Sequence, residues 1–207
     1  MKHPFRVLAF TAIAATFAAV SAFAQAQNVR VRGSIEKIDG DLLMVKSRDG
    51  ADLKLKLKPD AAVRGVVKAS LADIKAGVMV GITSMPQADG SLKAVEIHIF
   101  PAGQNVNQNH GPWDLLPNST MTNGAVQASV AGVDGQTLTV TYKRGDNPPE
   151  EKKILVTAQT IIAGYSPATK ADLKAGQRIF VANAPKLPDG TLEVASISYG
   201  KDIAPPM

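Results

Sequence analysis

Two histidines, each with a carboxylate close by in the sequence, have the types and spacing best suited to metal binding. Glu96 and His98 stand two residues apart on one expected strand, so their side chains share a face, and His110 shortly precedes Asp114. Imidazole and carboxylate groups are common ligands of divalent metals, and the thioether of Met121 would suit copper. Histidines on the surface of a strand are usually solvated, and a metal site of Glu96, His98, His110 and Asp114 is the alternative.

Catalytic motifs are missing from the sequence. Neither Gly-x-Ser-x-Gly nor His-Glu-x-x-His occurs, so neither a serine nucleophile at a sharp turn nor a zinc hydrolase is indicated. A pair of carboxylates for glycan hydrolysis would be expected in a cleft lined with aromatic rings, and aromatic residues make up only 5% of the chain. We therefore predict no catalytic residues and no enzyme activity.

The first 24 residues have the pattern of a signal peptide. Lys2 and Arg6 precede an uncharged run from Val7 to Ala24, which ends in the small-x-small triplet Ala22-Phe23-Ala24. A retained membrane anchor is the alternative, but the alanine-rich run and its cleavage triplet favour removal. The pattern predicts a periplasmic or secreted protein with no stable membrane insertion after cleavage. The chain has no cysteine, which excludes disulfide and thiolate chemistry.

The charge of the mature chain does not favour nucleic acid as a partner. Removal of the signal segment takes two of the 23 basic residues and none of the 18 acidic ones, which lowers the net charge from +5 to +3. Lys54, Lys56 and Lys58 do alternate along one strand, but leucines separate them, as on the solvated face of an ordinary strand.

The mature chain is a tandem repeat, in which Val29 to Phe100 corresponds to Val126 to Tyr199. We predict repeat 1 at residues 28–101, a linker at 102–125, repeat 2 at 126–200 and a tail at 201–207. Three matched segments carry the alignment: Ile38-Asp39-Gly40 with Val133-Asp134-Gly135, Ala72 to Gly77 with Ala171 to Gly176, and Asp89 to Leu92 with Asp189 to Leu192.

Each copy is expected to form an all-β, five-stranded barrel of the OB type. Short alternating apolar runs are separated by Asp-Gly pairs, which are turn signals because glycine supplies a positive φ. Between the third and fourth strands, Ser70-x-x-Asp73 and Thr169-x-x-Asp172 resemble capping boxes, and Gly77 and Gly176 stand where a helical turn should end. Three strands, a short helical turn and two strands fit an OB-like barrel, with a small open sheet or an SH3-like barrel as the alternative.

The period of two along a strand divides the apolar residues between two faces. In the first copy Leu42, Met44, Met79 and Met85 should point outward, where the second copy has Thr137, Thr139, Arg178 and Ala184. This apolar flank is either covered by the linker or the second barrel, or is a site for a hydrophobic ligand or partner. The residues expected to point inward are Val80, Ile82, Val95, Ile97 and Ile99, with Ile179, Val181, Ala195, Ile197 and Tyr199 in the second copy.

The linker contains the one tryptophan of the chain, Trp113, followed by Leu115 and Leu116. Large apolar side chains are usually buried, whereas those of a free linker would be exposed to solvent. We therefore expect this segment to dock on a barrel. A binding or interface role is therefore predicted for Trp113, Leu115, Met44, Met79, Met85 and Met121.

The segments His110 to Leu115, Ser119 to Asn123 and Pro205 to Met207 together resemble a family of exported proteobacterial proteins. The family has tandem OB-like repeats of unknown function, and its members are often named automatically as metal ABC transporter permeases. The name does not suit this sequence, because a permease needs several membrane spans. Family members carry charged residues where this chain has Asn107, Gln108 and Asn109. The resemblance implies a clamp in which His110, Trp113 and Asp114 hold the barrels together.

Taken together, these patterns predict a non-catalytic periplasmic binding or accessory protein. Its two barrels would present one composite surface around residues 105 to 125, to a small ligand or to an envelope protein. No cofactor is expected. The alternative is an accessory protein that binds a divalent metal for uptake or storage.

Overall fold

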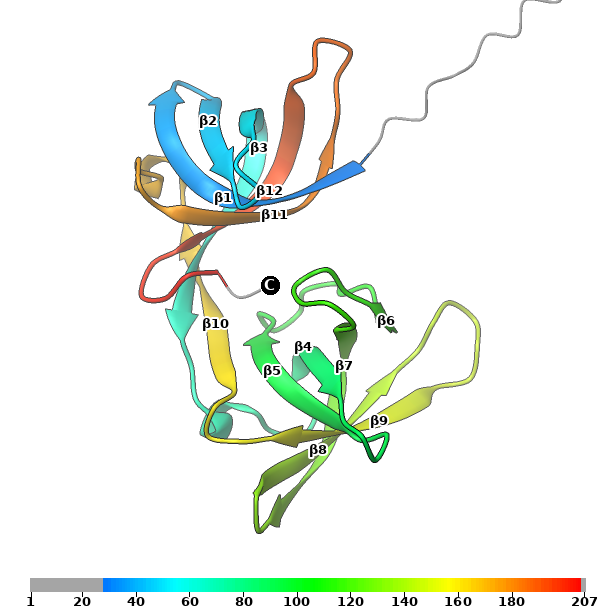
Figure 1. Ribbon diagram of the computed structural model, residues 1–207. Coiled ribbons are helices and arrows are strands. Elements are labelled where there is room, and N and C mark those ends of the chain that lie inside the picture. The colour runs from blue at the N-terminus through cyan, green and yellow to red at the C-terminus, as the bar shows by residue number, and fades with distance from the viewer. Residues whose placement is uncertain (1–27, 206–207) are drawn as a thin grey trace, which may run out of the picture.

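The computed structural model describes residues 28–205, which are nearly all β-structure with two short 3-10 turns (Figure 1). No helix in this part of the chain is long and apolar enough to cross a membrane. The signal peptide predicted at residues 1–24 lies outside the described residues. The strands are β1 (Asn28–Asp39), β2 (Leu42–Ser47), β3 (Asp52–Lys68), β4 (Met79–Pro86), β5 (Leu92–Ile99), β6 (Asn109–Pro112), β7 (Thr120–Gly132), β8 (Gly135–Tyr142), β9 (Glu150–Val156), β10 (Ile161–Ala168), β11 (Arg178–Pro185) and β12 (Leu192–Gly200), and the turns are η1 (Leu71–Asp73) and η2 (Lys170–Asp172).

Five strands close into a β-barrel in the order β1-β2-β3-β12-β11. β1 pairs with β2 on one side and with β11 on the other, and a parallel pairing of β3 with β12 closes the ring. Its interior is a cluster of buried aliphatic side chains that includes Ile35, Leu43, Leu55, Val181 and Ile197. Because each strand alternates inward and outward residues, these side chains come from every strand of the ring.

The strands β4, β5, β7, β8 and β9 form a second strand set with the same order of neighbours. β7 pairs with β4 and β8, β8 pairs with β9, and β4 pairs with β5. The two ends of the set meet in a short parallel pairing of β5 with β9, at Leu92↔Ile154 and Lys93↔Leu155. A second cluster of buried residues fills this set, including Ile82, Ile97 and Leu138.

The two copies of the repeat exchange strands, which corrects the expectation that residues 28–101 and 126–200 each close a barrel alone. The barrel takes β1, β2 and β3 from the first copy and β11 and β12 from the second. The second strand set takes β7, β8 and β9 from the second copy and β4 and β5 from the first. The predicted copies of the repeat therefore do not coincide with the structural units.

The exchange passes through β3 and β10, which run antiparallel between the two units (Figure 1). Their pairing extends from Val63↔Ala168 to Lys68↔Ala163, and β10 then continues in parallel beside β5. The 17-residue β3 pairs with β12 as far as Val66, and its last six residues pair with β10. Its end therefore lies beside β10, and the strands that follow belong to the other unit.

The second copy begins before the predicted boundary at residue 126, because β7 starts at Thr120. The strand register makes Gly124 the counterpart of Gly33, since Gly33 pairs with Ile179 and Gly124 pairs with Val80. The two glycines also share one environment. A Cβ would lie 2.3 Å from the carbonyl oxygen of Lys46 at Gly33, and 2.4 Å from that of Thr141 at Gly124. Residues 120–125 therefore belong to the repeat and not to the linker.

The predicted division of side chains between the inner and outer faces is correct along most strands, but it is wrong at two bulges. The register shifts opposite Thr83–Ser84 on β5 and between Val194 and Ser196 on β12. A bulge adds one residue to one strand and so reverses the faces beyond it. Ala94 and Val194 are consequently buried in the cores, whereas Val95 is half-buried and Ala195 is exposed, contrary to the prediction.

The predicted turns and caps are confirmed. The carboxylate of Asp73 accepts hydrogen bonds from the backbone N–H and the hydroxyl of Ser70, and Asp172 does the same for Thr169. Gly77 has φ of 84°, which is the left-handed conformation that ends such a turn. These caps directly precede β4 and β11, the first strand that each copy contributes to the other unit.

Candidate functional site

Residues 113–116, here called the interlobe segment, lie between the barrel and the second strand set. β6 pairs with β7 from Asn109↔Asn123 to Pro112↔Thr120, which fixes where the segment begins. The buried Ser119 then closes it into a turn, since its hydroxyl contacts the carbonyl oxygens of Trp113 and Leu116 at 3.1 and 2.8 Å. Asp114 of this segment contacts Arg30 and Arg32 of the barrel, so the segment lies against the barrel.

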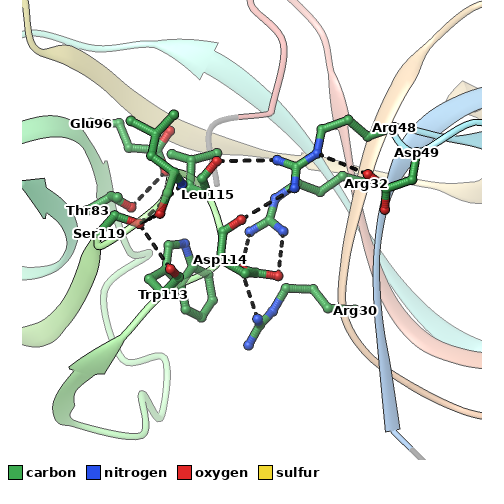
Figure 2. A network of polar contacts seen from close by, with 11 residues as sticks. Arg30, Arg32, Arg48, Asp49, Thr83, Glu96, Trp113, Asp114, Leu115 and Ser119 are labelled. Carbon is green, nitrogen blue, oxygen red and sulfur yellow. Dashed lines mark hydrogen bonds and ion pairs between the residues drawn. The ribbon is translucent and has the colours of Figure 1, made fainter.

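Asp114 anchors the interlobe segment to β1 of the barrel (Figure 2). Its carboxylate accepts two hydrogen bonds from Arg32, both 2.9 Å long, and an ion pair from Arg30 at 2.9 Å. Partial burial raises the pKa of Asp114, but the hydrogen bonds from Arg32 and Arg30 outweigh it and hold the pKa at about 2. Asp114 is therefore ionised at neutral pH and serves as an ion-pair anchor.

The same arginines stack on aromatic rings. The guanidinium of Arg30 lies 3.9 Å from the centre of the Trp113 ring, and that of Arg32 lies 5.6 Å from it and 5.1 Å from the ring of Phe180. Arg48 adds two long hydrogen bonds of 3.4 Å to the carbonyl oxygens of Asp114 and Leu115 (Figure 2). Planar guanidinium groups suit such stacking and forked pairing. Three arginines thus hold one short segment against the barrel.

One side of the interlobe segment faces a groove of about 950 Å³ between the two units. Leu115 and Leu116 line it, together with Ile161 of β10 and Ile203 of the tail. Of the four large apolar side chains that are exposed among residues 28–205, two are here, Leu116 at 41% and Ile161 at 52%. The groove wall is therefore apolar along part of its length and open to solvent.

Basic side chains also line this groove. Three of these side chains already have partners. Arg32 pairs with the carboxylate of Asp114, Arg48 with the carbonyl oxygen of Asp114, and Lys46 with the carboxylate of Asp52. Lys68 and Arg178 are exposed, and no ion pair to either occurs among residues 28–205. The groove therefore combines aliphatic side chains with two cations that are available to an anion.

The other side of the interlobe segment faces a smaller hollow of about 180 Å³, here called the aromatic cavity. Six Phe, Tyr and Trp residues occur in the described chain, and four of them line this cavity. The ring centres of His98 and Phe100 are 4.7 Å apart in an edge-to-face arrangement, and that of Tyr165 lies 6.2 Å from His98. The lining comprises His98, Phe100, Trp113, Tyr165 and Phe180, with Arg64, Gln104, Met121, Asn123, Ala182, Ser196 and Ser198.

Three buried polar atoms at the aromatic cavity have no hydrogen-bond partner among the described residues. They are Nδ1 of His98, Nε1 of Trp113 and Oδ1 of Asn123. Burial lowers the pKa of His98 to about 4, so its ring is neutral at pH 7 and offers one donor and one acceptor. Burial also raises the pKa of Tyr165, which keeps its hydroxyl protonated.

The structure disperses the four candidate metal ligands. The Glu96 carboxylate is buried beside the Thr83 hydroxyl, and His98 lies in the aromatic cavity, so neither is solvated as predicted. His110 Nδ1 lies 2.8 Å from the Thr122 hydroxyl, and Asp114 is held by arginines. Within residues 28–205, no three His, Asp or Glu side chains gather as a metal site would require.

The methionines and leucines predicted as an interface divide between several places. Met121 is buried and lines the aromatic cavity, and Leu115 lines the groove. Met44, Met79 and Met85 are half-buried and line neither hollow, so the predicted apolar flank is not part of this site.

Sequence reasoning missed the aromatic rings that meet Trp113. Phe100, Tyr165 and Phe180 stand far apart in the chain, and the strand exchange brings them together. The aligned repeats contain one indication of this contact. Gly81 and His98 of the first copy correspond to Phe180 and Ser198 of the second, so the small and the large residue of the pair are exchanged between the two strands.

Comparison of the chain with protein-family models, with curated proteins and with solved structures finds no match.

Proposed function

We propose that this chain is an exported, non-catalytic binding protein that holds an amphipathic anion in the groove between its two units. The observation that carries the proposal is the composition of the groove wall. The exposed Leu116 and Ile161 line the same hollow of about 950 Å³ as Lys68 and Arg178. That volume lies in the range of about 300–1,000 Å³ that is usual for small-molecule sites.

The chemistry of the wall selects the kind of ligand. The aliphatic side chains suit a hydrocarbon chain, because burying each methylene contributes about 0.8 kcal/mol. Lys68 and Arg178 suit a carboxylate or phosphate head group, and no carboxylate of the wall pairs with either of them in the described chain. A fatty acid with a chain of eight to twelve carbons combines both features and serves as the probe.

The architecture supports a role in presenting one composite surface. We propose that the second strand set is a closed barrel like the first and that both are OB-like. The order of three strands, a short helical turn and two strands in each copy supports this, as does the matching order of neighbours in the two sets. Location in the periplasm or outside the cell is part of the proposal and rests on the sequence of residues 1–24.

Calorimetric titration of the mature chain with octanoate, decanoate and dodecanoate tests the proposal. The dissociation constant should fall about 15-fold for every two methylenes, since these contribute about 1.6 kcal/mol. Decanol, which lacks the charge, should bind at least tenfold more weakly than decanoate. Equal affinity for the three acids, or no heat with any of them, would overturn the proposal.

Matched variants locate the site. Ile161→Glu places a like charge in the groove and should abolish decanoate binding. Val133→Glu is the control, because Val133 is fully exposed and does not line the groove. The double variant Lys68→Gln and Arg178→Gln should bind decanoate and decanol alike. Wild-type binding by Ile161→Glu would exclude the groove as the site.

A further inference from the structure

The aromatic cavity is separate from the groove, and its lining has a different chemistry. Its walls carry four of the six Phe, Tyr and Trp side chains of residues 28–205, whereas the groove wall carries none. Trp113 faces the cavity, and Leu115 and Leu116 of the same short segment face the groove. The two hollows therefore lie on opposite sides of the interlobe segment and would take different ligands.

The size of the aromatic cavity fits one aromatic ring. An apolar cavity of about 150 Å³ in another protein binds benzene. The aromatic cavity measures about 180 Å³, which leaves room for a ring and one small substituent. The stacking surfaces of Phe100, Trp113 and Phe180 favour a planar guest.

The polar atoms of the cavity indicate that the guest carries a polar group. His98 is fully buried, and its Nδ1 has no hydrogen-bond partner among the described residues. The same is true of Nε1 of Trp113 and Oδ1 of Asn123. Leaving a buried polar atom unpaired costs about 1–3 kcal/mol. A ligand that paired with these atoms would recover part of that cost.

The charges around the cavity decide the sign of that polar group. Arg64 is the one charged residue in the lining described here, and no Asp or Glu takes part. Within residues 28–205, Arg64 makes one long side-chain hydrogen bond, of 3.3 Å, to the Ser196 hydroxyl. The guanidinium of Arg30 lies over the ring of Trp113, so a cationic guest near that ring would be repelled by a second positive charge. A carboxylate meets Arg64 with two parallel hydrogen bonds, whereas an ammonium group would be repelled.

We propose that the aromatic cavity is a second binding site, which takes a single-ring aromatic carboxylate. Arg64 binds the carboxylate, the rings of Phe100, Trp113 and Phe180 hold the aromatic ring, and His98 supplies a polar contact in its neutral form. The site does not depend on the groove, so the two proposals stand or fall separately.

Three single-ring probes that differ in charge test this site: benzoate, benzamide and the benzylammonium ion. Trp113 is the sole tryptophan and forms part of the cavity wall, so its fluorescence reports occupancy directly. Benzoate should change the emission with a dissociation constant below about 1 mM, and benzamide should bind at least tenfold more weakly. Benzylammonium should not bind. No response to 10 mM benzoate, or equal responses to all three probes, would overturn the proposal.

Two variants and one control assign the residues. Arg64→Gln should weaken benzoate at least tenfold and leave benzamide unchanged, which separates charge recognition from a general loss of folding. Ala182→Phe fills the mouth of the cavity and should abolish the response. Ala195→Phe is the control, because Ala195 is also exposed but lines neither hollow. Wild-type benzoate binding by Arg64→Gln or Ala182→Phe would refute the assignment, and Ile161→Glu should bind benzoate normally.

Discussion

At the scale of single residues, the interface between the two units depends on an exchange of large and small side chains. Gly81 of β4 is paired with His98 of β5, and Phe180 of β11 is paired with Ser198 of β12. The two pairs occupy equivalent positions in the two copies. In each pair a small residue leaves room for a ring: Gly81 for His98, and Ser198 for Phe180. Both rings line the aromatic cavity between the units.

Gly81 is required by the ring of His98 and not by its own backbone conformation. A Cβ at this position would lie 2.2 Å from Nε2 of His98 and 2.7 Å from Oδ1 of Asn123. We predict that Gly81→Ala lowers the free energy of unfolding by about 1–3 kcal/mol, which is the usual cost of overpacking. Urea denaturation measures the change.

Gly111→Ala is the matched control for Gly81→Ala. A Cβ at Gly111 meets nothing within 4 Å, and its φ is not positive, so its effect should stay within about 0.5 kcal/mol. Equal effects of the two substitutions would show that the close approach of Gly81 to His98 does not exist in solution.

His98 gives the protein a specific sensitivity to acid. Burial lowers the pKa of His98 from 6.5 in the unfolded chain to about 4 in the folded one, so the unfolded state binds more protons between these values. Stability should therefore fall as the pH falls from 6.5 toward 4, by about 2 kcal/mol at pH 4.5 from this group alone. Tyr165 also lines the cavity around His98, and burial raises its pKa, so its hydroxyl stays protonated throughout this window.

The comparison of His98→Gln with the wild type isolates that contribution, because every other titratable group is present in both proteins. The difference in the free energy of unfolding between them should change by about 2 kcal/mol between pH 7 and pH 4.5, in favour of the variant at low pH. Parallel stability curves for the two proteins over this range would mean that His98 is solvated in the folded state.

At the scale of elements, ion pairs and cation–π contacts hold the interlobe segment against the barrel. The carboxylate of Asp114 pairs with the same two arginines that lie over the ring of Trp113, Arg30 and Arg32. We predict that Asp114→Ala frees the segment and raises the quenching of Trp113 fluorescence by acrylamide. The loss of stability should be at most about 1 kcal/mol, because the carboxylate is half-exposed.

Asp49→Ala serves as the control for Asp114→Ala. Asp49 is 88% exposed and approaches Arg48 only at 4.0 Å, so its removal should leave the quenching of Trp113 unchanged. High salt should reproduce part of the effect of Asp114→Ala in the wild type, since screening weakens exposed ion pairs. Quenching that is identical in the two variants would show that Asp114 does not position the segment.

Turns and caps are predictable from this sequence because one or two neighbouring residues determine them. The pairing register of the strands is not predictable, because residues far away in the chain determine it. The turns at Asp-Gly pairs and the caps at Ser70 and Thr169 follow from what one residue does to its own backbone. The bulge at Val95 has no local signal, because Ala94 and Val95 are both apolar and either could face the core. The buried position of His98 was missed for a related reason, since its cover comes from the other unit.

At the scale of the whole molecule, the strand exchange could not be read from the repeat. Equivalent strands of the two copies present apolar residues at equivalent core positions, as Ile82 and Val181 do, so a strand from either copy completes a ring. The path of β3 and β10 decides between exchanged strands and two barrels that each close from one copy. The six antiparallel residue pairs between β3 and β10 form only when both strands extend beyond their own units.

The strand exchange makes the linker dispensable for holding the two units together. A protease site inserted between the exposed residues Ala102 and Gly103 divides the chain into a piece with β1 to β5 and a piece with β6 to β12. We predict that the cut protein elutes as one species in size-exclusion chromatography, because each unit contains strands from both pieces. Its pieces should separate only in denaturant, and their sheet signal in circular dichroism should then be lost.

The opposite arrangement predicts a different outcome for the same cut. If each copy closed a barrel from its own five strands, the two pieces would share only surface contacts such as the Asp114 ion pairs. Those contacts contribute little at an exposed site and weaken in salt. The pieces would then separate in 1 M NaCl as two folded barrels, each with its own sheet signal. Co-elution in high salt therefore distinguishes exchanged strands from two barrels that merely touch.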